Sequence, residues 1–335
     1  MSKNYGHIPI LINLKLNKIL YQKNNENISF LSIVIPTYDR IENLKKLLTH
    51  IAAEKYLKNV EIIILDNCSN SIIPDTFFLE LFEGINITYI QNKFHLGPDF
   101  NYLKSIELAH SDWIYPIGDS KIPIRGFVEI LLRDIQEFKE SYGIVYKYAS
   151  QITNNMNISN FVNIAPKNIH IGDFFLGGNS IISKKSLKDY LCIAGQLTLT
   201  RMPHISFHLM PLLNNQQITL RKDNIIDIFL QKPAHYDPKL SYLECLGQFA
   251  LIDVITNNWK FRKIINKKIF QIYGEIWRII YHTLKFTFKH RIDVSSNMHR
   301  IIKFRFMFNY GFFSLFVIYL LFVLTRFLKL INYAR

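Results

Sequence analysis

Cysteine is scarce in this sequence and follows no recognisable pattern. Only three cysteines occur among the 335 residues, at Cys68, Cys192 and Cys245, and none belongs to a CxxC pair. An odd, scattered set supports neither a disulfide framework nor a four-thiolate zinc site. The cysteine content is therefore typical of a protein in a reducing compartment.

Glycine-rich phosphate loops are missing as well. The chain has only 13 glycines, and neither GxGxxG nor GxxxxGK[ST] follows the first predicted strand. Those loops cradle the phosphates of dinucleotides and of nucleoside triphosphates. Their absence argues against a dinucleotide-dependent oxidoreductase and against a P-loop NTPase.

The N-terminus lacks a secretory signal. Its short apolar stretch at residues 8–12 is broken by Pro9, and no small-residue cleavage site follows. We therefore expect the protein to stay in the cytoplasm. A composition that is 49% apolar and 14% aromatic excludes a disordered chain, and the length suggests about two domains.

Negative charge is nearly absent from the last quarter of the chain. Residues 258–335 hold fifteen Lys or Arg but only Glu275 and Asp293, a net charge of +13 out of +14 for the whole protein. Basic and aromatic residues alternate at 259–263 and 276–281, and residues 306–325 are uncharged. This composition is typical of helices that lie in or on an anionic membrane.

Two alternatives for this C-terminal region stay open. Its helices would pack on the protein body or on a second subunit, giving a homo-oligomer, or bind a nucleic acid. The long apolar run at 306–325 disfavours nucleic acid, because a phosphate-tracking surface does not need it. We expect peripheral or monotopic attachment to the inner face of the cell membrane, and positive charge on both flanks of 306–325 leaves its orientation open.

The middle of the chain alternates predicted strands and helices. Apolar runs predict strands, and apolar residues at helical spacing predict helices. The strands are expected at Leu31–Ile35, Val60–Leu65, Ile85–Ile90, Trp113–Ile117 and Gly143–Tyr148, and the helices at Glu42–Glu54, Pro98–Ala109 and Phe127–Phe138. This order predicts an α/β fold with a mostly parallel sheet flanked by helices.

Polar residues follow three of these strands. Thr37-Tyr38-Asp39-Arg40, Asp66-Asn67 and Asp119-Ser120-Lys121 each come directly after or close behind a strand. Ligands bind at the carboxyl ends of the strands in parallel sheets. We therefore expect these side chains to share one site.

The motifs at these positions resemble those of glycosyltransferase family 2, which has the GT-A fold. Residues 32–40 resemble the family's "PTYNR" turn, and residues 61–69 resemble "EIIVVDDGS". Residues 92–101 are similar to "N-x-G-P-x-x-N", residues 113–121 to "YIWFLGDDD", and residues 177–180 to an acceptor-side "GG" stretch. The resemblance covers roughly 30–236.

The resemblance implies a site for a nucleotide-sugar donor. In it Asp39 and Asp66 hold the base and ribose, and Asp119 contacts the ribose. The alternative is that Asp39 and Asp66 only end strands or cap helices. The full donor-binding set is expected to be Pro36, Thr37, Asp39, Arg40, Asp66, Asn67, Gly97, Asn101, Asp119, Ser120 and Lys121.

The chain departs from the family at its metal-binding DxD motif. The third residue, the usual ligand of Mn²⁺ or Mg²⁺, is Lys121 here. A protonated lysine has only donors and cannot coordinate a metal. Three interpretations follow: Lys121 replaces the cation at the diphosphate, the site is degenerate and inactive, or Asp119 alone holds a weakly bound metal. We favour the first.

The family inverts the sugar's configuration, so a general base should deprotonate the acceptor hydroxyl. The Glu-Asp pair that often supplies this base is missing, and residues 202–204 resemble a "YPH" variant. We expect His204 to be the base, with Asp173 next and Glu244 after it. A packing role for His204 stays open, and a zinc site from His204 and His208 is disfavoured because no HExxH motif or third ligand is present.

We interpret the chain as an N-terminal extension (1–29), a GT-A domain (30–240) and a basic, aromatic-rich helical region (241–335). The predicted function is inverting transfer of a sugar from a nucleotide diphosphate, by family analogy UDP, to a lipid-linked or cell-surface glycan at the membrane. A non-catalytic GT-A homologue that binds or scaffolds at the membrane is the alternative.

Overall fold

The computed structural model describes residues 17–23, 30–146, 178–200, 203–221 and 223–230, and Arg262. All of these except Arg262 belong to one compact unit. Asp173, Gly177, Glu244 and, apart from Arg262, the basic region 241–335 lie outside the described residues. Among the described residues, no helix combines the length and the apolarity needed to cross a membrane.

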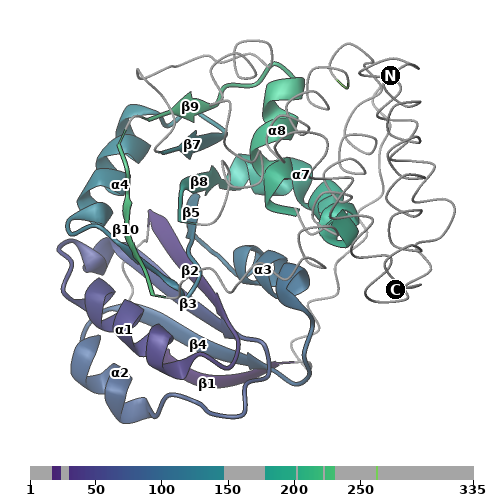
Figure 1. Ribbon diagram of the computed structural model, residues 1–335. Helices are drawn as coiled ribbons and strands as arrows, with labels where there is room; N and C mark the ends of the chain where they lie inside the picture. The colour runs from purple at the N-terminus through teal and green to yellow at the C-terminus, as the bar shows by residue number, and fades with distance from the viewer. Residues whose placement is uncertain are drawn as a thin grey trace, which may run out of the picture. The chain divides into compact units, whose positions relative to one another are not determined.

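An eight-stranded mixed sheet forms the centre of this unit (Figure 1). Its strands, in spatial order, are β1 (Asn17–Lys23), β4 (Asn86–Asn92), β3 (Val60–Asp66), β2 (Leu31–Thr37), β5 (Trp113–Pro116), β8 (Ser180–Ser183), β7 (Gly143–Val145) and β9 (Thr219–Leu220). Strands β4, β3, β2 and β5 are parallel, while β1 and β8 pair antiparallel to their neighbours. A second, two-stranded sheet joins β6 (Lys121–Pro123) and β10 (Ile226–Phe229).

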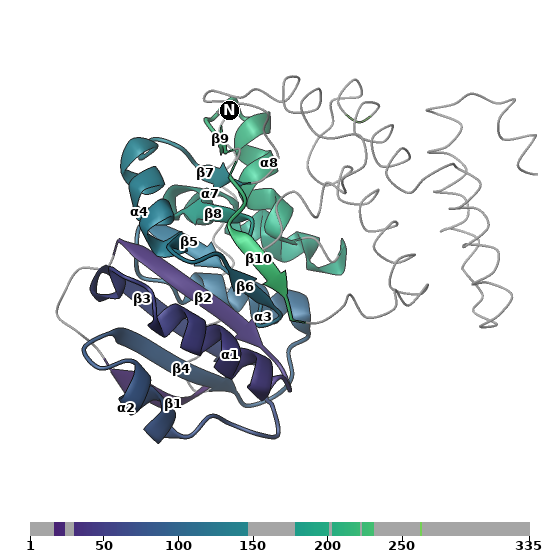
Figure 2. The same ribbon diagram turned by 60° about the vertical axis from the view of Figure 1, so that its left-hand side comes forward.

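Helices cover both faces of the large sheet. Figures 1 and 2 show α1, α2 and α4 on one side and α3 and α7 on the other. The helices are α1 (Ile41–Ala52), α2 (Asp75–Leu81), α3 (Pro98–Glu107), α4 (Phe127–Glu137), α7 (Lys184–Gln196) and α8 (Ser206–Leu213), with short 3₁₀ turns η2 (Leu57–Asn59), η3 (Leu197–Thr200) and η4 (Pro203–Ile205).

The predicted α/β class is confirmed. The strands expected at 31–35, 60–65, 85–90 and 113–117 and the three expected helices all form, with ends within two residues of those predicted. The strand expected at 143–148 forms over Gly143–Val145. Strands β1 and β8 were not predicted, and β1 lies in the segment assigned to an N-terminal extension.

Burial explains why β2 and β3 occupy the middle of the sheet. Every residue of β3 is buried, and β2 is buried except at Pro36. Strands covered by helices on both faces are continuous apolar runs rather than alternating ones. Helix α1 instead buries one stripe, at Leu44, Leu47, Leu48 and Ile51. This spacing places its apolar side chains against the sheet.

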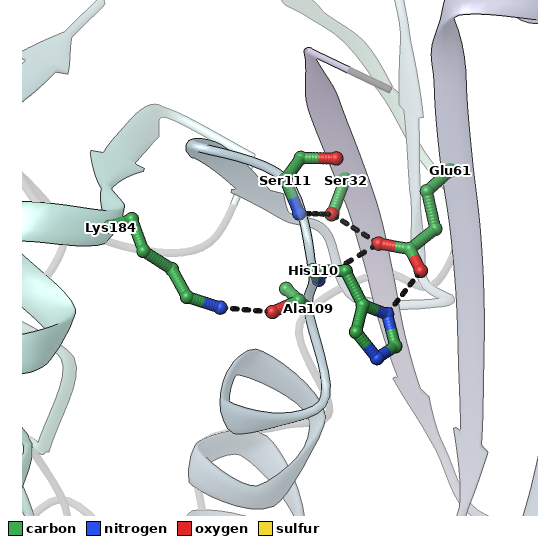
Figure 3. A network of polar contacts seen from close by, with 6 residues as sticks. All are labelled: Ser32, Glu61, Ala109, His110, Ser111 and Lys184. Atoms are coloured by element: carbon green, nitrogen blue, oxygen red, sulfur yellow. Dashed lines mark hydrogen bonds and ion pairs between the residues drawn. The ribbon is translucent and has the colours of Figure 1, made fainter. Parts of the chain in front are cut away.

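A polar cluster fastens the amino ends of β2 and β3, at the edge of the sheet opposite the expected site (Figure 3). The buried Glu61 carboxylate accepts hydrogen bonds from Ser32 Oγ (2.5 Å) and from the backbone N–H of His110 (3.0 Å), and its other oxygen lies 2.6 Å from His110 Nδ1. Ser111 N–H in turn donates to Ser32 Oγ, and Lys184 donates to the Ala109 carbonyl. The cluster thereby fixes the α3–β5 turn to both strands and to α7.

Candidate functional site

The carboxyl ends of β2 and β3 and the loop after β5 meet at one cavity of about 470 Å³. Parallel pairing puts Thr37 beside Asp66, and Val34 beside Pro116, so the segments that follow these strands leave the sheet at the same edge. Nine residues predicted from the sequence line this cavity: Pro36, Thr37, Arg40, Asn67, Asn101, Asp119, Ser120, Lys121 and His204.

Asp119 is buried at the cavity and is held by two side chains. It is 3% exposed, its Oδ2 accepts a hydrogen bond from Thr37 Oγ1 (2.7 Å), and its Oδ1 lies 3.2 Å from an Arg40 guanidinium nitrogen. Burial raises the pKa of Asp119, while the Thr37 hydroxyl and the Arg40 cation act in the opposite direction. The contacts of Thr37 and Arg40 with Asp119 connect the end of β2 and the loop after it to the loop after β5.

The side chains around Asp119 do not form the usual ligand set of a divalent cation. Both Asp119 oxygens already have partners, and one partner is a cation. Hard divalent ions need several oxygen ligands, usually carboxylates. No group of three His, Cys, Asp or Glu within the described part of the chain is arranged to hold a metal. A metal on Asp119 would lie next to the Arg40 cation, and Lys121 stands where the motif normally supplies a ligand.

Asp39 and Asp66 lie next to the cavity but are not among the residues that line it. Asp66 is buried and accepts hydrogen bonds from the Ser69 N–H (2.7 Å) and from the hydroxyl of Tyr89 (3.0 Å). Asp39 accepts a bond from the Asn70 N–H (3.0 Å) and donates its own N–H to Ser69 Oγ (2.7 Å). These contacts shape the loops after β2 and β3, and the expected roles of both residues in donor binding stay predictions.

Gly97 does not line the cavity, but it contacts two residues that do. Its φ of +81° lies in a region that glycine tolerates best, and it precedes α3. Its carbonyl accepts from Asn67 Nδ2 (3.3 Å) and from the Asn101 N–H (3.1 Å). The turn therefore fixes two of the predicted cavity residues.

Seven lining residues are not among the donor-binding and catalytic residues predicted from the sequence. They are Tyr38, His95, Pro98, Asp99, Tyr102, Gly118 and Pro203. Tyr38 and His95 meet edge to face, with ring centroids 4.5 Å apart, and Tyr102 meets His204 at 6.1 Å. Each of these residues is adjacent in sequence, or close, to a predicted one, so proximity to the motifs was the available signal.

The two histidines at i and i+4 have different surroundings. His204, on η4, lines the cavity, whereas His208 on α8 is fully buried. His208 Nε2 lies 3.0 Å from Ser180 Oγ, and its ring packs so closely on Gly143 that a Cβ there would lie 2.5 Å from Nδ1. Desolvation by burial lowers the pKa of His208 to about 3, and nearby His204 acts in the same direction. His208 is therefore a buried core residue whose ring packs against β7 and β8.

Residues 32–191 match the protein-family model described as Glycosyl transferase family 2. They form a family 2 glycosyltransferase domain.

A curated relative supports the same family. The abequosyltransferase RfbV of Salmonella typhimurium is 32% identical over 120 residues, which are 35% of this chain and 34% of that protein. The chain thus matches about a third of the length of this relative.

Several solved structures share the fold. Staphylococcus aureus TarS residues 1–349 superpose with a TM-score of 0.57 at 12% identity, over 84% of this chain and 81% of that one. The same protein in complex with UDP-GlcNAc gives 0.56 at 13%, over 83% and 81%. The mannosyltransferase PcManGT of Pyrobaculum calidifontis, in complex with GDP-Man and Mn²⁺, gives 0.52 at 10%, over 83% and 79%. At these identities the likeness establishes the GT-A-like fold of the glycosyltransferase domain.

We predict that His208 makes the domain acid-sensitive. Because its pKa in the folded protein is about 3, below the ordinary 6.5, the unfolded chain binds a proton below pH 6.5 that the folded chain does not. The free energy of unfolding therefore decreases as the pH falls from about 6.5 towards 3. In His208→Asn, the fall in Tm between pH 7 and pH 4.5 should be smaller than in the wild type by at least about 4 °C.

Thermal unfolding monitored across this pH range measures the effect. The matched control is His95→Asn, since His95 is exposed and should leave the wild-type pH profile in place. An equally steep fall in His208→Asn and in the wild type would contradict the prediction.

Proposed function

We propose that the protein transfers a sugar from a nucleotide-diphosphate sugar to a hydroxyl group, with inversion. The observation that carries this proposal is the cavity at the carboxyl ends of β2 and β3, lined by Thr37, Asn67 and Asp119 inside a family 2 glycosyltransferase domain. Ligands of open α/β sheets bind at this edge. The relatives' names, abequosyltransferase and mannosyltransferase, support a transferase.

In this proposal, basic side chains balance the negative charge of the diphosphate. Arg40 and Lys121 both line the cavity, and the charge that grows on the diphosphate as the sugar leaves is stabilised by such fixed cations. Lys121 acts as a point charge at phosphate oxygens, as lysines do in other phosphate sites. Lys121 therefore takes the electrostatic role of the divalent ion.

His204 is proposed as the general base. It lines the cavity on η4, where its ring meets Tyr102 at an angle of 78°. An imidazole titrates near neutral pH without special tuning, so it accepts a proton from a sugar hydroxyl readily. Asp173, the other residue expected in this role, lies outside the described residues.

The acceptor is proposed to be a lipid-linked or cell-surface glycan at the cytoplasmic face of the membrane. The support is the net charge of +13 in residues 258–335 together with the uncharged run 306–325. An enzyme and an acceptor held on one surface meet at a raised effective concentration. UDP is the proposed carrier, by analogy with the family.

The proposed donor site predicts nucleotide binding without a metal. Calorimetric titration of the full chain with UDP, GDP, TDP and CMP, each with Mn²⁺ and again with EDTA, should give one nucleoside diphosphate whose Kd changes by less than about threefold on metal removal, which is under 1 kcal/mol. Asp119→Ala should abolish hydrolysis of the corresponding sugar donor. Lys121→Asp should make binding depend on Mn²⁺, because it restores a carboxylate in the DxD position.

Three other outcomes of these measurements would contradict part or all of the proposed function. Strict dependence of the wild type on Mn²⁺ would remove the role of Lys121 and keep the transferase. Binding without hydrolysis would favour the non-catalytic homologue that binds a nucleotide sugar. Absence of binding in all conditions would overturn the proposed function.

If His204 is the general base, its replacement should slow the reaction without weakening nucleotide binding. In His204→Asn, the rate of donor hydrolysis, with water in the place of the acceptor, should fall by about 10²- to 10⁴-fold. The Kd of the nucleotide should stay near that of the wild type, because the base faces the acceptor. His95→Asn, on the wall beside Tyr38, should instead change Kd more than rate. An unchanged hydrolysis rate in His204→Asn would contradict the assignment.

The C-terminal charge predicts salt-sensitive membrane binding. The full chain should sediment with vesicles that contain an anionic phospholipid more than with purely zwitterionic vesicles. Because each basic residue near an anionic surface contributes about 1 kcal/mol, the bound fraction should fall as salt is raised. Deletion of residues 258–335 should leave the protein in the supernatant. Equal retention of the truncated chain, or stronger retention on duplex DNA, would contradict membrane attachment.

A further inference from the structure

One lysine of the domain is buried behind the cavity rather than in it. Lys104 lies on α3, is 9% exposed and is not among the residues that line the cavity. Its Nζ donates a hydrogen bond to Asn92 Oδ1 at 2.9 Å. Burial lowers the pKa of Lys104, while Glu107, one turn further along α3, acts against this shift. Lysines are rarely buried unless a specific interaction needs them.

Asn92 connects this lysine to two residues of the cavity wall. Asn92, at the end of β4, is buried, and its Nδ2 donates to Asn101 Oδ1 (2.8 Å) and to Asn67 Oδ1 (3.4 Å). Asn67 and Asn101 both line the cavity. A continuous hydrogen-bonded chain therefore runs from the Lys104 ammonium to the site.

The ammonium fixes the orientation of the Asn92 amide, and backbone groups favour the matching orientation at both wall residues. A protonated lysine only donates, so the carbonyl oxygen of Asn92 must face it and the Asn92 NH₂ group must face away. That NH₂ group then donates to the oxygens of Asn67 and Asn101. Asn67 Oδ1 also accepts a hydrogen bond from the Leu96 N–H (2.8 Å), and Asn101 Nδ2 donates to a backbone carbonyl. If any of these amides turned over, donors would face donors inside a buried cluster, which costs the unmade hydrogen bonds.

These orientations leave both wall residues as donors. Asn67 Nδ2 donates to the Gly97 carbonyl (3.3 Å), and Asn101 Nδ2 donates to the Leu65 carbonyl (3.2 Å). Each NH₂ group carries a second proton that these bonds do not use. Because both side-chain oxygens point into the network, the polar group that each residue offers to a ligand is an N–H.

We infer that Lys104 is a positioning residue for the nucleotide diphosphate: through Asn92 it holds Asn67 and Asn101 as hydrogen-bond donors toward the oxygen atoms of the nucleotide. The inference rests on the proposed function. The ligand chemistry is that of an acceptor-rich anion, whose ribose, carbonyl or phosphate oxygens accept N–H groups. The buried positive charge adds to the attraction exerted by Arg40 and Lys121.

Lys104→Met removes the ammonium and has two opposite effects on stability. The cost of keeping a charge away from water disappears, but Asn92 Oδ1 loses this donor and stays buried. Methionine has nearly the length of lysine and adapts to irregular spaces. The Lys104→Met substitution should therefore lower nucleotide affinity more than it changes stability.

The test is calorimetric titration of full-length Lys104→Met with the nucleoside diphosphate of the panel that the wild type binds, together with thermal unfolding. We expect Kd to rise about 10- to 100-fold, the range for loss of a charge-assisted buried network. The Tm should differ from that of the wild type by less than about 4 °C, because the two effects on stability oppose one another. Lys185→Met, on α7, removes an equal charge at an exposed position and should leave Kd unchanged.

Asn92→Asp tests the direction of the bonds separately. Its carboxylate still accepts from Lys104, but it cannot donate to Asn67 and Asn101 when ionised. We expect a loss of affinity similar to that of Lys104→Met, and a double variant no weaker than either single one. This variant also keeps the side-chain volume and the lysine, so it carries the test if Lys104→Met fails to fold.

The outcomes separate the inference from the proposed function. A wild type that binds no nucleotide overturns both. A wild type that binds, with wild-type Kd in Lys104→Met and Asn92→Asp, overturns the inference and leaves the proposed function standing. A lowered Tm with unchanged Kd, or unfolding of both variants, makes the network structural and overturns the inference.

Discussion

The parallel pairing of β2 with β3 and with β5 is the constraint on which the rest of this structure depends. The register places Thr37 beside Asp66 and ends both strands at the same edge, so the polar segments that follow them share one space. Burial of both faces of these strands holds that register, because a slip by one residue would exchange the two faces. At the opposite edge, the contacts of Glu61 with Ser32 and His110 fasten the same strands.

Charge in the cavity is balanced by side chains. Arg40 pairs with Asp119 at 3.2 Å, which offsets the cost of keeping that carboxylate buried, and Lys121 adds a second cation at the wall. In the proposed donor site, Arg40 and Lys121 would surround an anionic donor with positive charge although the DxD motif has lost its last acidic residue. Behind the wall, the Lys104 ammonium donates to Asn92, whose NH₂ group in turn donates to Asn101 and Asn67.

Acidic residues of similar sequence context have different surroundings in this fold. Asp39, Asp66 and Asp119 each follow a strand, yet only Asp119 lines the cavity. Asp66 is held by Ser69 and Tyr89, and Asp39 by Asn70, so both stabilise the loops around the cavity. A motif gives the position of a carboxylate along the chain, but its hydrogen-bond partners lie between 3 and 82 residues away in the sequence.

The sequence alone determined the alternation of strands and helices, the edge of the sheet that carries the site, and most of the cavity residues, because apolar periodicity and strand ends are local properties. It did not determine the antiparallel strands β1 and β8, which depend on pairing with residues far along the chain. Nor did it predict that His208 is fully buried while His204, four residues earlier, lines the cavity. The tertiary structure also decided the role of Lys104: a lysine in an amphipathic helix is ordinarily solvated, and only the packing of α3 against β2 and β3 places this ammonium on Asn92.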